Sequence, residues 1–263
     1  MAIALIIALL LVTIACIYLF AVHPWWFPAG ASAYAAAVDH EFSTAFWLLG
    51  GLFIVAQFVL VFLLLRSWRK QTSSYDPGHW GIELGWTMAV AVLFFWFHFS
   101  GGRLWSTMRL HEPEAGAVQV EVTGAQFQWY FRYPGADGVF GRVDAQKFSK
   151  PEEGNGLGID PADPAGRDDI VSTSLVLPVG RDVELDLHGQ DVIHSLFIPA
   201  MRFKQDTVPG MTIQTHLRPT RVGTYEIACA ELCGTGHYRM RAVARVVTQE
   251  QFAAWLKAHQ EQQ

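Results

Sequence analysis

Charge is missing from long parts of this 263-residue chain. Residues 1–22 and 44–65 contain no charged residue, and residues 84–100 contain His98 as their one titratable group. A helix that crosses the hydrocarbon core of a bilayer needs about 20 mostly apolar residues. The lack of charge therefore excludes a fully soluble chain and predicts three membrane-spanning helices, at about residues 1–22, 44–65 and 83–101.

The first apolar run also lacks the marks of a cleaved signal peptide. It has no basic start, and no A-x-A-like cleavage site is obvious at its end. Thr13-Ile-Ala-Cys16 is a poor lipoprotein cleavage box, because Thr13 stands where leucine is expected. We therefore expect the first helix to be retained, with Cys16 as an ordinary apolar helix residue.

Basic residues are scarce, and their position sets the expected orientation. Arg66, Arg69 and Lys70 lie between the second and third apolar runs. The positive-inside rule then places the loop of residues 67–80 in the cytoplasm and everything after Gly101 outside. We expect a membrane anchor at residues 1–110 and an exterior domain at residues 111–263.

The two parts differ in charge. Residues 1–110 carry five Lys/Arg and four Asp/Glu, a net charge of +1. Residues 111–263 carry fourteen Lys/Arg and twenty Asp/Glu, a net charge of −6, and the two parts add to the whole-chain net charge of −5. An acidic exterior domain attracts a basic partner in a salt-sensitive way, although charge alone is equally consistent with simple solubility. We expect no nucleic-acid partner, because an acidic surface repels the phosphate backbone.

The exterior domain has the pattern of an all-β sandwich. Short β-rich runs separated by Gly and Pro occur at residues 118–123, 127–133, 174–177, 183–187, 194–198, 212–216, 223–228 and 241–247. Residues 249–259 predict a closing helix with Thr248 as its N-cap. Residues 135–169 are rich in Gly, Pro and Asp and predict a long surface loop. Internal repeats are absent.

One twelve-residue stretch, CAELCGTGHYRM, carries most of the metal-ligating chemistry. It contains Cys229, Cys233, His237 and Met240, with Glu231 between the two cysteines. A disulfide is one interpretation, because the domain lies in an oxidising compartment. Structural zinc is a second, although zinc rarely uses a thioether. Copper is a third, because thiolate, imidazole and thioether together suit an electron-transfer copper site.

A copper site at this stretch needs a further histidine. A mononuclear site uses one cysteine, whereas two cysteines allow two coppers bridged by both thiolates. Each copper then needs a nitrogen and a weak axial ligand, and the Glu231 carbonyl is a candidate for one axial position. The candidate imidazoles of the domain are His111, His188, His194, His216, His237 and His259. His194 stands out, because it begins a strand directly after polar turn residues.

These residues together resemble the cytochrome c oxidase subunit II family. Its binuclear copper loop reads Cys-x-Glu-x-Cys-Gly-x-x-His-x-x-Met, and Cys229 to Met240 matches every position. Asp191-Val-Ile-His194-Ser195 with Pro199 matches its upstream histidine motif. The resemblance runs from about residue 43 to the C-terminus. Further matches within it are Lys204-Gln-Asp206, Pro209-Gly210 and Gly223-Thr-Tyr225.

The resemblance implies a cupredoxin-like sandwich that holds two copper ions. The implied ligands are His194, Cys229, the Glu231 carbonyl, Cys233, His237 and Met240. The centre would take electrons from cytochrome c, or from a fused or associated cytochrome, and pass them to haem in subunit I. There dioxygen is reduced to water and protons are pumped. The Glu231 side chain would help hold a magnesium ion at the interface with subunit I.

Two further matches carry expected roles. Glu83-Leu-Gly-Trp86-Thr87 resembles a signature near the start of the last span, whose glutamate lies close to a proton-uptake path; a plain helix-end carboxylate is the alternative. Trp129 matches one tryptophan of the family's aromatic patch, and Phe127 replaces the tryptophan at which electrons usually enter. Trp129 could equally be a core residue.

Departures from the family pattern indicate a prokaryotic subtype. Met211 stands where arginine commonly follows Pro-Gly, the loop at residues 135–169 is long, and an extra helix precedes the usual two. A copper-containing nitric oxide reductase subunit is the closest alternative. Nitrous oxide reductase is soluble, a quinol oxidase subunit II lacks the copper ligands, and a copper chaperone needs no membrane hairpin.

Overall fold

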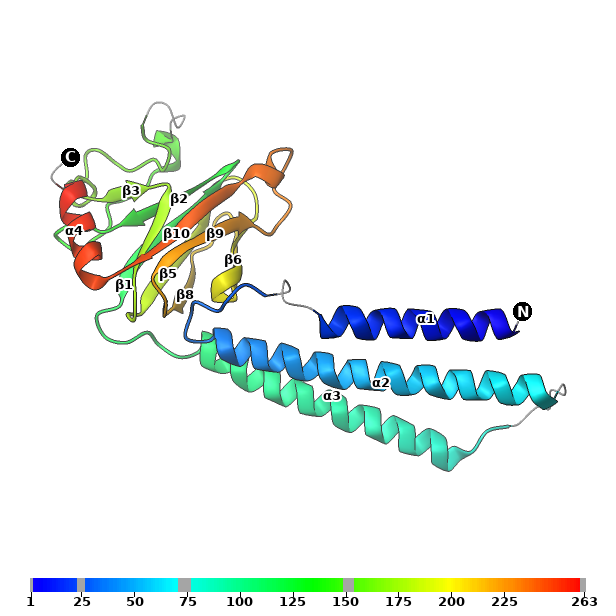
Figure 1. Cartoon of the computed structure of the whole chain (residues 1–263). Coiled ribbons are helices and arrows are strands. Elements are labelled where there is room, and N and C mark those ends of the chain that lie inside the picture. The colour runs from blue at the N-terminus through cyan, green and yellow to red at the C-terminus, as the bar shows by residue number, and fades with distance from the viewer. Residues whose placement is uncertain (1, 23–26, 71–76, 149–153, 261–263) are drawn as a thin grey trace. The chain divides into compact units, whose positions relative to one another are not determined.

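The chain folds into two compact units, which the computed structural model describes for residues 2–22, 27–70, 77–148 and 154–260 (Figure 1). One unit consists of Met1–Trp26 and Ala37–Ser106, and the other of Phe27–Ala36 and Thr107–Gln263. Residues 71–76 of the loop expected in the cytoplasm lie outside the described residues, as do residues 149–153 of the long loop.

The first unit is helical. Its helices are α1 (Ala2–Ala21), α2 (Ala35–Lys70) and α3 (Trp80–Arg109), and each is long and apolar enough to cross a membrane. The 36 residues of α2 extend about 54 Å, well beyond a hydrocarbon core of about 30 Å. The longer helices therefore include polar turns on either side of the apolar runs seen in the sequence.

Side-chain contacts join these helices to one another. The Phe20 ring of α1 meets the edges of Phe46 and Trp47 on α2, with ring centroids 5.9 and 5.3 Å apart. Between α2 and α3, the Ser100 hydroxyl donates a hydrogen bond to the Glu41 carboxylate. Large apolar side chains such as Phe58 and Phe94 otherwise point outward, as expected for helices that face lipid.

The second unit is a β-sandwich. Among the described residues, ten strands form two five-stranded sheets, with strand orders β3-β2-β1-β5-β8 and β4-β10-β9-β6-β7. The strands are β1 (Val118–Ala125), β2 (Gln128–Tyr133), β3 (Ile170–Ser172), β4 (Ser174–Pro178), β5 (Val183–Gly189), β6 (His194–Ile198), β7 (Phe203–Thr207), β8 (Ile213–Leu217), β9 (Gly223–Cys229) and β10 (Arg241–Val247). Three apolar helices followed by an all-β sandwich confirm the predicted fold class.

The core lies between the two sheets and follows the alternation of the strands. Val120 and Val122 on β1 face inward, while Glu121 between them faces out. On β2, Trp129 and Phe131 enter the same core and are completely buried. Alternate apolar positions therefore fix the register, because a slip of one residue would turn them toward solvent.

The closing helix α4 (Gln249–Gln260) begins with a capping box. The Thr248 hydroxyl accepts from the Gln251 backbone N–H at 3.3 Å, and the Gln251 side-chain oxygen accepts from the Thr248 N–H at 3.1 Å. Phe252 and Trp255 then pack against Tyr133, with ring centroids 6.3 and 4.9 Å away. The structure thus places Thr248 in the capping role that the sequence indicated.

A short segment before α2 is built into the sandwich. We call Phe27–Ala36 the strap. The Ala31 N–H donates to the Ala200 carbonyl at 2.7 Å, and the Thr220 N–H donates to the Ala31 carbonyl at 2.8 Å. The Ser32 hydroxyl donates to the Met201 carbonyl at 2.7 Å. These bonds make the strap a component of the second unit, although it lies some 80 residues before β1 in the sequence.

Candidate metal centre

Two strands and one loop bring the sulfur and imidazole side chains together. His194 begins β6 and Cys229 ends β9, and these strands pair antiparallel with Leu196 opposite Cys229. β10 then returns along β9, so the chain at Met240 passes beside Cys229, whose N–H donates to the Met240 carbonyl at 3.1 Å. The loop between β9 and β10 carries the remaining donors.

The donor atoms form one compact cluster. The Cys229 and Cys233 Sγ atoms are 3.8 Å apart, and Cys233 Sγ lies 3.6 Å from His237 Nδ1 and 3.7 Å from Met240 Sδ. His194 Nδ1 lies 3.2 Å from Met240 Sδ. The Glu231 carbonyl oxygen is 3.2 Å from Cys229 Sγ. The structure therefore brings together all six residues named as ligands from the sequence.

Glycine is required in this loop at two positions. Gly234 has φ of +133°, a conformation that side-chain-bearing residues rarely adopt. At Gly236 a Cβ atom would lie only 2.4 Å from the Phe127 ring. The loop is also tied to the β1–β2 turn, because the Gln126 side-chain amide donates to the Cys233 carbonyl at 2.6 Å. The β9–β10 loop is thus held by two residues of the β1–β2 turn, through packing on the Phe127 ring and a hydrogen bond from Gln126.

Asp191 fixes the orientation of His194. Its Oδ1 lies 2.8 Å from His194 Nε2, and its Oδ2 accepts from the Gln126 N–H at 2.7 Å. Burial alone would raise the pKa of Asp191, but the bonds from His194, Gln126 and Val192 outweigh it and hold the pKa below its usual value. A carboxylate that holds one imidazole nitrogen leaves the other free to bind a metal. The sequence pattern includes Asp191 in the histidine motif but indicates this supporting role for neither Asp191 nor Gln126.

A second carboxylate supports the same strand. The Ser195 hydroxyl donates to Asp206 Oδ1 at 2.7 Å, and Lys204 Nζ lies 3.0 Å from the same oxygen. The Ser195 carbonyl accepts from the Ala230 N–H at 3.0 Å, which connects β6 to the first residue after Cys229. The Lys204-Gln-Asp206 motif therefore supports the Ser195 side chain of β6, while the Ser195 carbonyl links β6 to the residue after Cys229.

The thiols lie in a setting that favours a bound cation. Cys229 and Cys233 are both buried, and burial followed by the neighbouring Cys229 raises the pKa of Cys233 to about 11. Two adjacent thiolates repel each other in a buried site unless a cation lies between them. Metal binding here would release the thiol protons and become easier as pH rises.

The donor set fits copper better than the other two interpretations. Cys229 and Cys233 are free thiols, so the pair is not a disulfide. Met240 is buried with its sulfur among the donors, and a thioether suits copper rather than zinc. His194, Cys229 and Cys233 also form the one group of three potential metal ligands found within the described part of the chain.

The other residues predicted from the sequence lie in different settings. Trp129 is 0% exposed and packs beside His194, with ring centroids 6.0 Å apart. Phe127 is partly buried and lies in the turn between β1 and β2. The Glu231 side chain is exposed, as is Glu83 in the first turn of α3. Met211 is also exposed. Of these side chains, Trp129 lies beside His194, and Phe127 lies against Gly234 and Gly236 of the β9–β10 loop.

The sandwich and its donor cluster define a copper-binding, cupredoxin-like domain that follows helices able to span a membrane. Comparison with known proteins agrees. The family described as "Cytochrome C oxidase subunit II, periplasmic domain" matches residues 118–247. The alternative cytochrome c oxidase subunit 2 of Bradyrhizobium diazoefficiens is 34% identical over 98% of this chain and 91% of that protein. The cytochrome c oxidase subunit 2 of Cereibacter sphaeroides is 32% identical over 80% of this chain and 74% of that protein.

The chain belongs to the cytochrome c oxidase subunit II family. The corresponding subunit of Thermostichus vulcanus is 29% identical over 90% of this chain and 80% of that protein. A solved periplasmic domain of subunit II from Bradyrhizobium japonicum is 26% identical, covers 58% of this chain and 97% of that one, and has a TM-score of 0.41. The family is assigned from the sequence relatives, and a nitric oxide reductase subunit is not favoured.

Proposed function

We propose that the exterior domain holds a binuclear copper centre through His194, Cys229, Cys233, His237, Met240 and the Glu231 carbonyl. The observation that carries the proposal is the convergence of two thiols, two imidazoles and a thioether from β6 and the β9–β10 loop. In this assignment residues 1–110 act as the membrane anchor and residues 111–263 as the copper domain. The strap, which precedes α2, belongs to the latter by its contacts.

The residues around the cluster suit electron transfer. Copper held by these thiolates would supply reversible one-electron transfer. Asp191 holds His194, and Gln126 holds the Cys233 backbone, so the ligands keep their positions without the metal's help. Burial of Cys229, Cys233 and Met240 excludes water from the centre. A rigid, dry ligand set supports fast transfer because little has to reorganise.

The proposed electron path begins at a docked cytochrome c, or at a fused or associated cytochrome, and ends at haem in subunit I. There dioxygen would be reduced to water, with protons pumped across a prokaryotic plasma membrane. Phe127 is the partly exposed aromatic residue over the loop, and buried Trp129 lies behind it beside His194. We assign the point at which electrons enter to this pair, with Phe127 nearer to solvent.

Two carboxylates have proposed roles away from the copper. The Glu231 side chain is exposed while its backbone carbonyl faces Cys229, so it is available to help hold a magnesium ion with ligands from subunit I. Glu83 lies in the first turn of α3, one of the candidate spans. An ionisable residue at a span is a candidate for proton transfer, and we place Glu83 at a proton-uptake path.

Metal content tests the central proposal. The purified chain should bind two coppers, and its electron paramagnetic resonance spectrum should show hyperfine coupling shared by two nuclei. Cys229→Ser or Cys233→Ser should abolish this spectrum, because a neutral hydroxyl is a poor bridge for soft copper. Cys16→Ser is the matched control, since Cys16 is the remaining cysteine and lies in α1. A single zinc per chain would refute the proposal.

The methionine provides a graded second test. Met240→Leu removes a weak axial thioether, so copper should largely remain while the reduction potential shifts. A shift of about 60 mV in a one-electron couple changes the equilibrium constant tenfold. Loss of both coppers in Met240→Leu, or a normal spectrum in Cys233→Ser, would show that the ligand assignment is wrong.

A further inference from the structure

A turn that supplies no copper ligand contacts both of the segments that do. This turn, between β1 and β2, contains Gln126 and Phe127. The Gln126 backbone N–H donates to Asp191 Oδ2 at 2.7 Å, and Asp191 in turn holds His194. The Gln126 side-chain amide donates to the Cys233 carbonyl at 2.6 Å. One residue therefore connects the histidine side of the donor cluster to its cysteine side.

Cys233 lies at the centre of the donor cluster. Its Sγ atom is 3.8 Å from Cys229 Sγ, 3.6 Å from His237 Nδ1 and 3.7 Å from Met240 Sδ. The residue is buried, with 3% of its surface exposed. A displacement of Cys233 would therefore change three donor distances at once, so the position of this one sulfur governs the geometry of the donor set.

The loop that follows Cys233 is internally bonded, so a hold on Cys233 extends along it. The His237 N–H donates to the Gly234 carbonyl at 3.1 Å, and the Met240 N–H donates to the His237 carbonyl at 3.1 Å. At Gly234 a Cβ atom would lie 2.9 Å from Gln126 Nε2, so a side chain there would push the amide away. The loop thus provides both the acceptor for Gln126 and the space to reach it.

The turn is a fixed support, because it joins two paired strands. β1 and β2 pair directly up to the turn, with Ala125 opposite Gln128. Gly124, near the end of β1, packs so closely on Trp129 and His194 that a Cβ atom would lie 3.0 Å from the first and 3.1 Å from the second. A residue held by strands positions its partner more accurately than a residue on a free loop.

We propose that Gln126 is a positioning residue for the copper centre, whose side-chain amide fixes Cys233 and raises the reduction potential. This inference rests on the proposed function. The positive end of the amide N–H dipole points at the Cys233 backbone, and positive charge near the centre favours the form that has gained an electron. Hydrogen bonding around a cysteine ligand tunes the potential of copper sites.

Two variants close to glutamine in size remove the bond. Gln126→Met has no donor, and Gln126→Glu places a negative carboxylate at the same point. We expect the equilibrium constant for reduction to fall about tenfold in Gln126→Met, which is about 59 mV for a one-electron couple, and further in Gln126→Glu. Redox titration measures the potential, and electron paramagnetic resonance should show altered copper hyperfine coupling in both. If Gln126→Met does not fold, Gln126→Glu decides, because it keeps a polar side chain.

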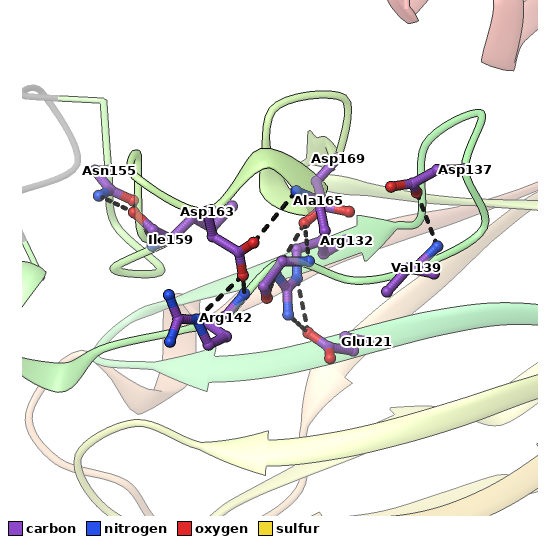
Figure 2. A network of polar contacts seen from close by, with 11 residues as sticks. Glu121, Arg132, Asp137, Val139, Arg142, Asn155, Ile159, Asp163, Ala165 and Asp169 are labelled. Carbon is purple, nitrogen blue, oxygen red and sulfur yellow. Dashed lines mark hydrogen bonds and ion pairs between the residues drawn. The ribbon is translucent and has the colours of Figure 1, made fainter.

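The long loop of residues 135–169 supplies a matched control (Figure 2). The Asn155 side-chain amide donates to the Ile159 carbonyl at 2.9 Å, and its oxygen accepts from the Ile159 N–H at 2.9 Å. Asn155→Leu therefore removes the same kind of bond from a loop that carries no copper ligand, and its potential and spectrum should equal the parent's. Equal changes in Asn155→Leu and Gln126→Met, or parent values in both Gln126 variants, would overturn the proposal.

A measurement on the metal-free full chain separates this inference from the proposed function. In a Cys16→Ser, Cys229→Ala background, Cys233 is the remaining cysteine. Its alkylation by N-ethylmaleimide should be at least fivefold faster with Gln126→Met, because the amide no longer holds the buried residue, and unchanged with Asn155→Leu. Absence of copper binding in the parent would refute the proposed function and leave this difference in rate. Equal rates with and without Gln126→Met would overturn the positioning role.

Discussion

At the scale of single residues, the partner of a histidine distinguishes its role better than burial does. His194 and His216 are both buried, but His194 points Nδ1 at the sulfur cluster, whereas His216 Nε2 lies 3.5 Å from the Tyr34 hydroxyl. His259 packs on Trp255 in α4. The motif spacing predicted the Cys, His and Met residues from sequence alone, and the structure brings their side chains together. The support from Asp191 could not be predicted in this way, because it depends on how the turn before β6 meets the β1–β2 turn.

Removing Asp191 should weaken copper binding without unfolding the domain. Asp191→Ala deletes the acceptor for His194 and for the Gln126 N–H, so copper affinity should fall about 10- to 100-fold. Asp191→Asn keeps an acceptor for His194 without the charge and should lie between Ala and the parent. Competition with a copper chelator measures the affinity. Asp163→Asn, on the long loop, is the control, and an affinity for Asp191→Ala equal to the parent's would contradict the role.

At the scale of secondary-structure elements, central strands were predictable and some edge strands were not. β3 and β7 were missed, and each lies at the edge of its sheet. β7 contains Lys204-Gln-Asp206, which lacks apolar alternation because an edge strand has one neighbour and is commonly polar. The long loop was predicted as a surface segment, and its anchoring through buried Arg132 and Asp169 depends on a pairing distant in sequence.

The strap is the other element that the sequence pattern did not indicate. Its residues Gly30-Ala31-Ser32-Ala33 carry no strand or helix signal, and their order comes from carbonyl and N–H groups of distant residues. Ala31 is 0% exposed, while Ala33 two residues later is exposed. Ser32 between them is buried, so burial ends between Ser32 and Ala33, and the two alanines give a matched pair of sites for mutation.

Ala31→Leu should destabilise the second unit, whereas Ala33→Leu should not. Forcing extra methylenes into a packed position costs about 1–3 kcal/mol, and a surface change of the same kind stays within about 0.5 kcal/mol. Thermal unfolding in detergent, followed by the circular dichroism of the β-sandwich, should show a melting temperature lowered by several degrees in Ala31→Leu alone. Equal melting temperatures for the two variants would show that the strap is not packed as described.

At the scale of the whole molecule, one ion network links the start of the exterior domain to the sheets. Asp182 before β5 accepts from Arg218 Nε at 2.7 Å and from the Glu114 N–H at 2.9 Å. Burial alone would raise the pKa of Asp182, but the bonds from Arg218 and Glu114 dominate and lower it. The charged form of the Asp182 carboxylate therefore stabilises the folded state.

This network predicts how stability changes with pH. A carboxylate with a lowered pKa stabilises the fold fully above its unfolded pKa of about 4, and that contribution is lost as pH falls through the folded value. Asp182→Asn should therefore cost about 1–3 kcal/mol at pH 7, and its deficit relative to the parent should shrink below pH 4. Urea unfolding at a series of pH values measures both. The exposed Glu226→Gln serves as the control, and a deficit that is constant with pH would exclude a charge-based role.

The membrane topology follows from charge placed on one side of the helical unit. Arg66 and Arg69 lie at the end of α2, whereas the acidic β-sandwich follows α3. Since Lys and Arg near a span are retained inside, Lys70 and its neighbours should face the cytoplasm and the copper domain the exterior.

Reciprocal reporter fusions test this orientation. Alkaline phosphatase, which is active only after export, should be active when joined after Leu110 and inactive when joined after Lys70. Green fluorescent protein, which matures in the cytoplasm, should give the opposite result at the same two positions. Replacing Arg66, Arg69 and Lys70 together by Gln should weaken the preference at both fusion sites, because it removes the charge that holds the loop inside. Phosphatase activity after Lys70 in the parent sequence would reverse the topology and place the metal centre on the cytoplasmic side.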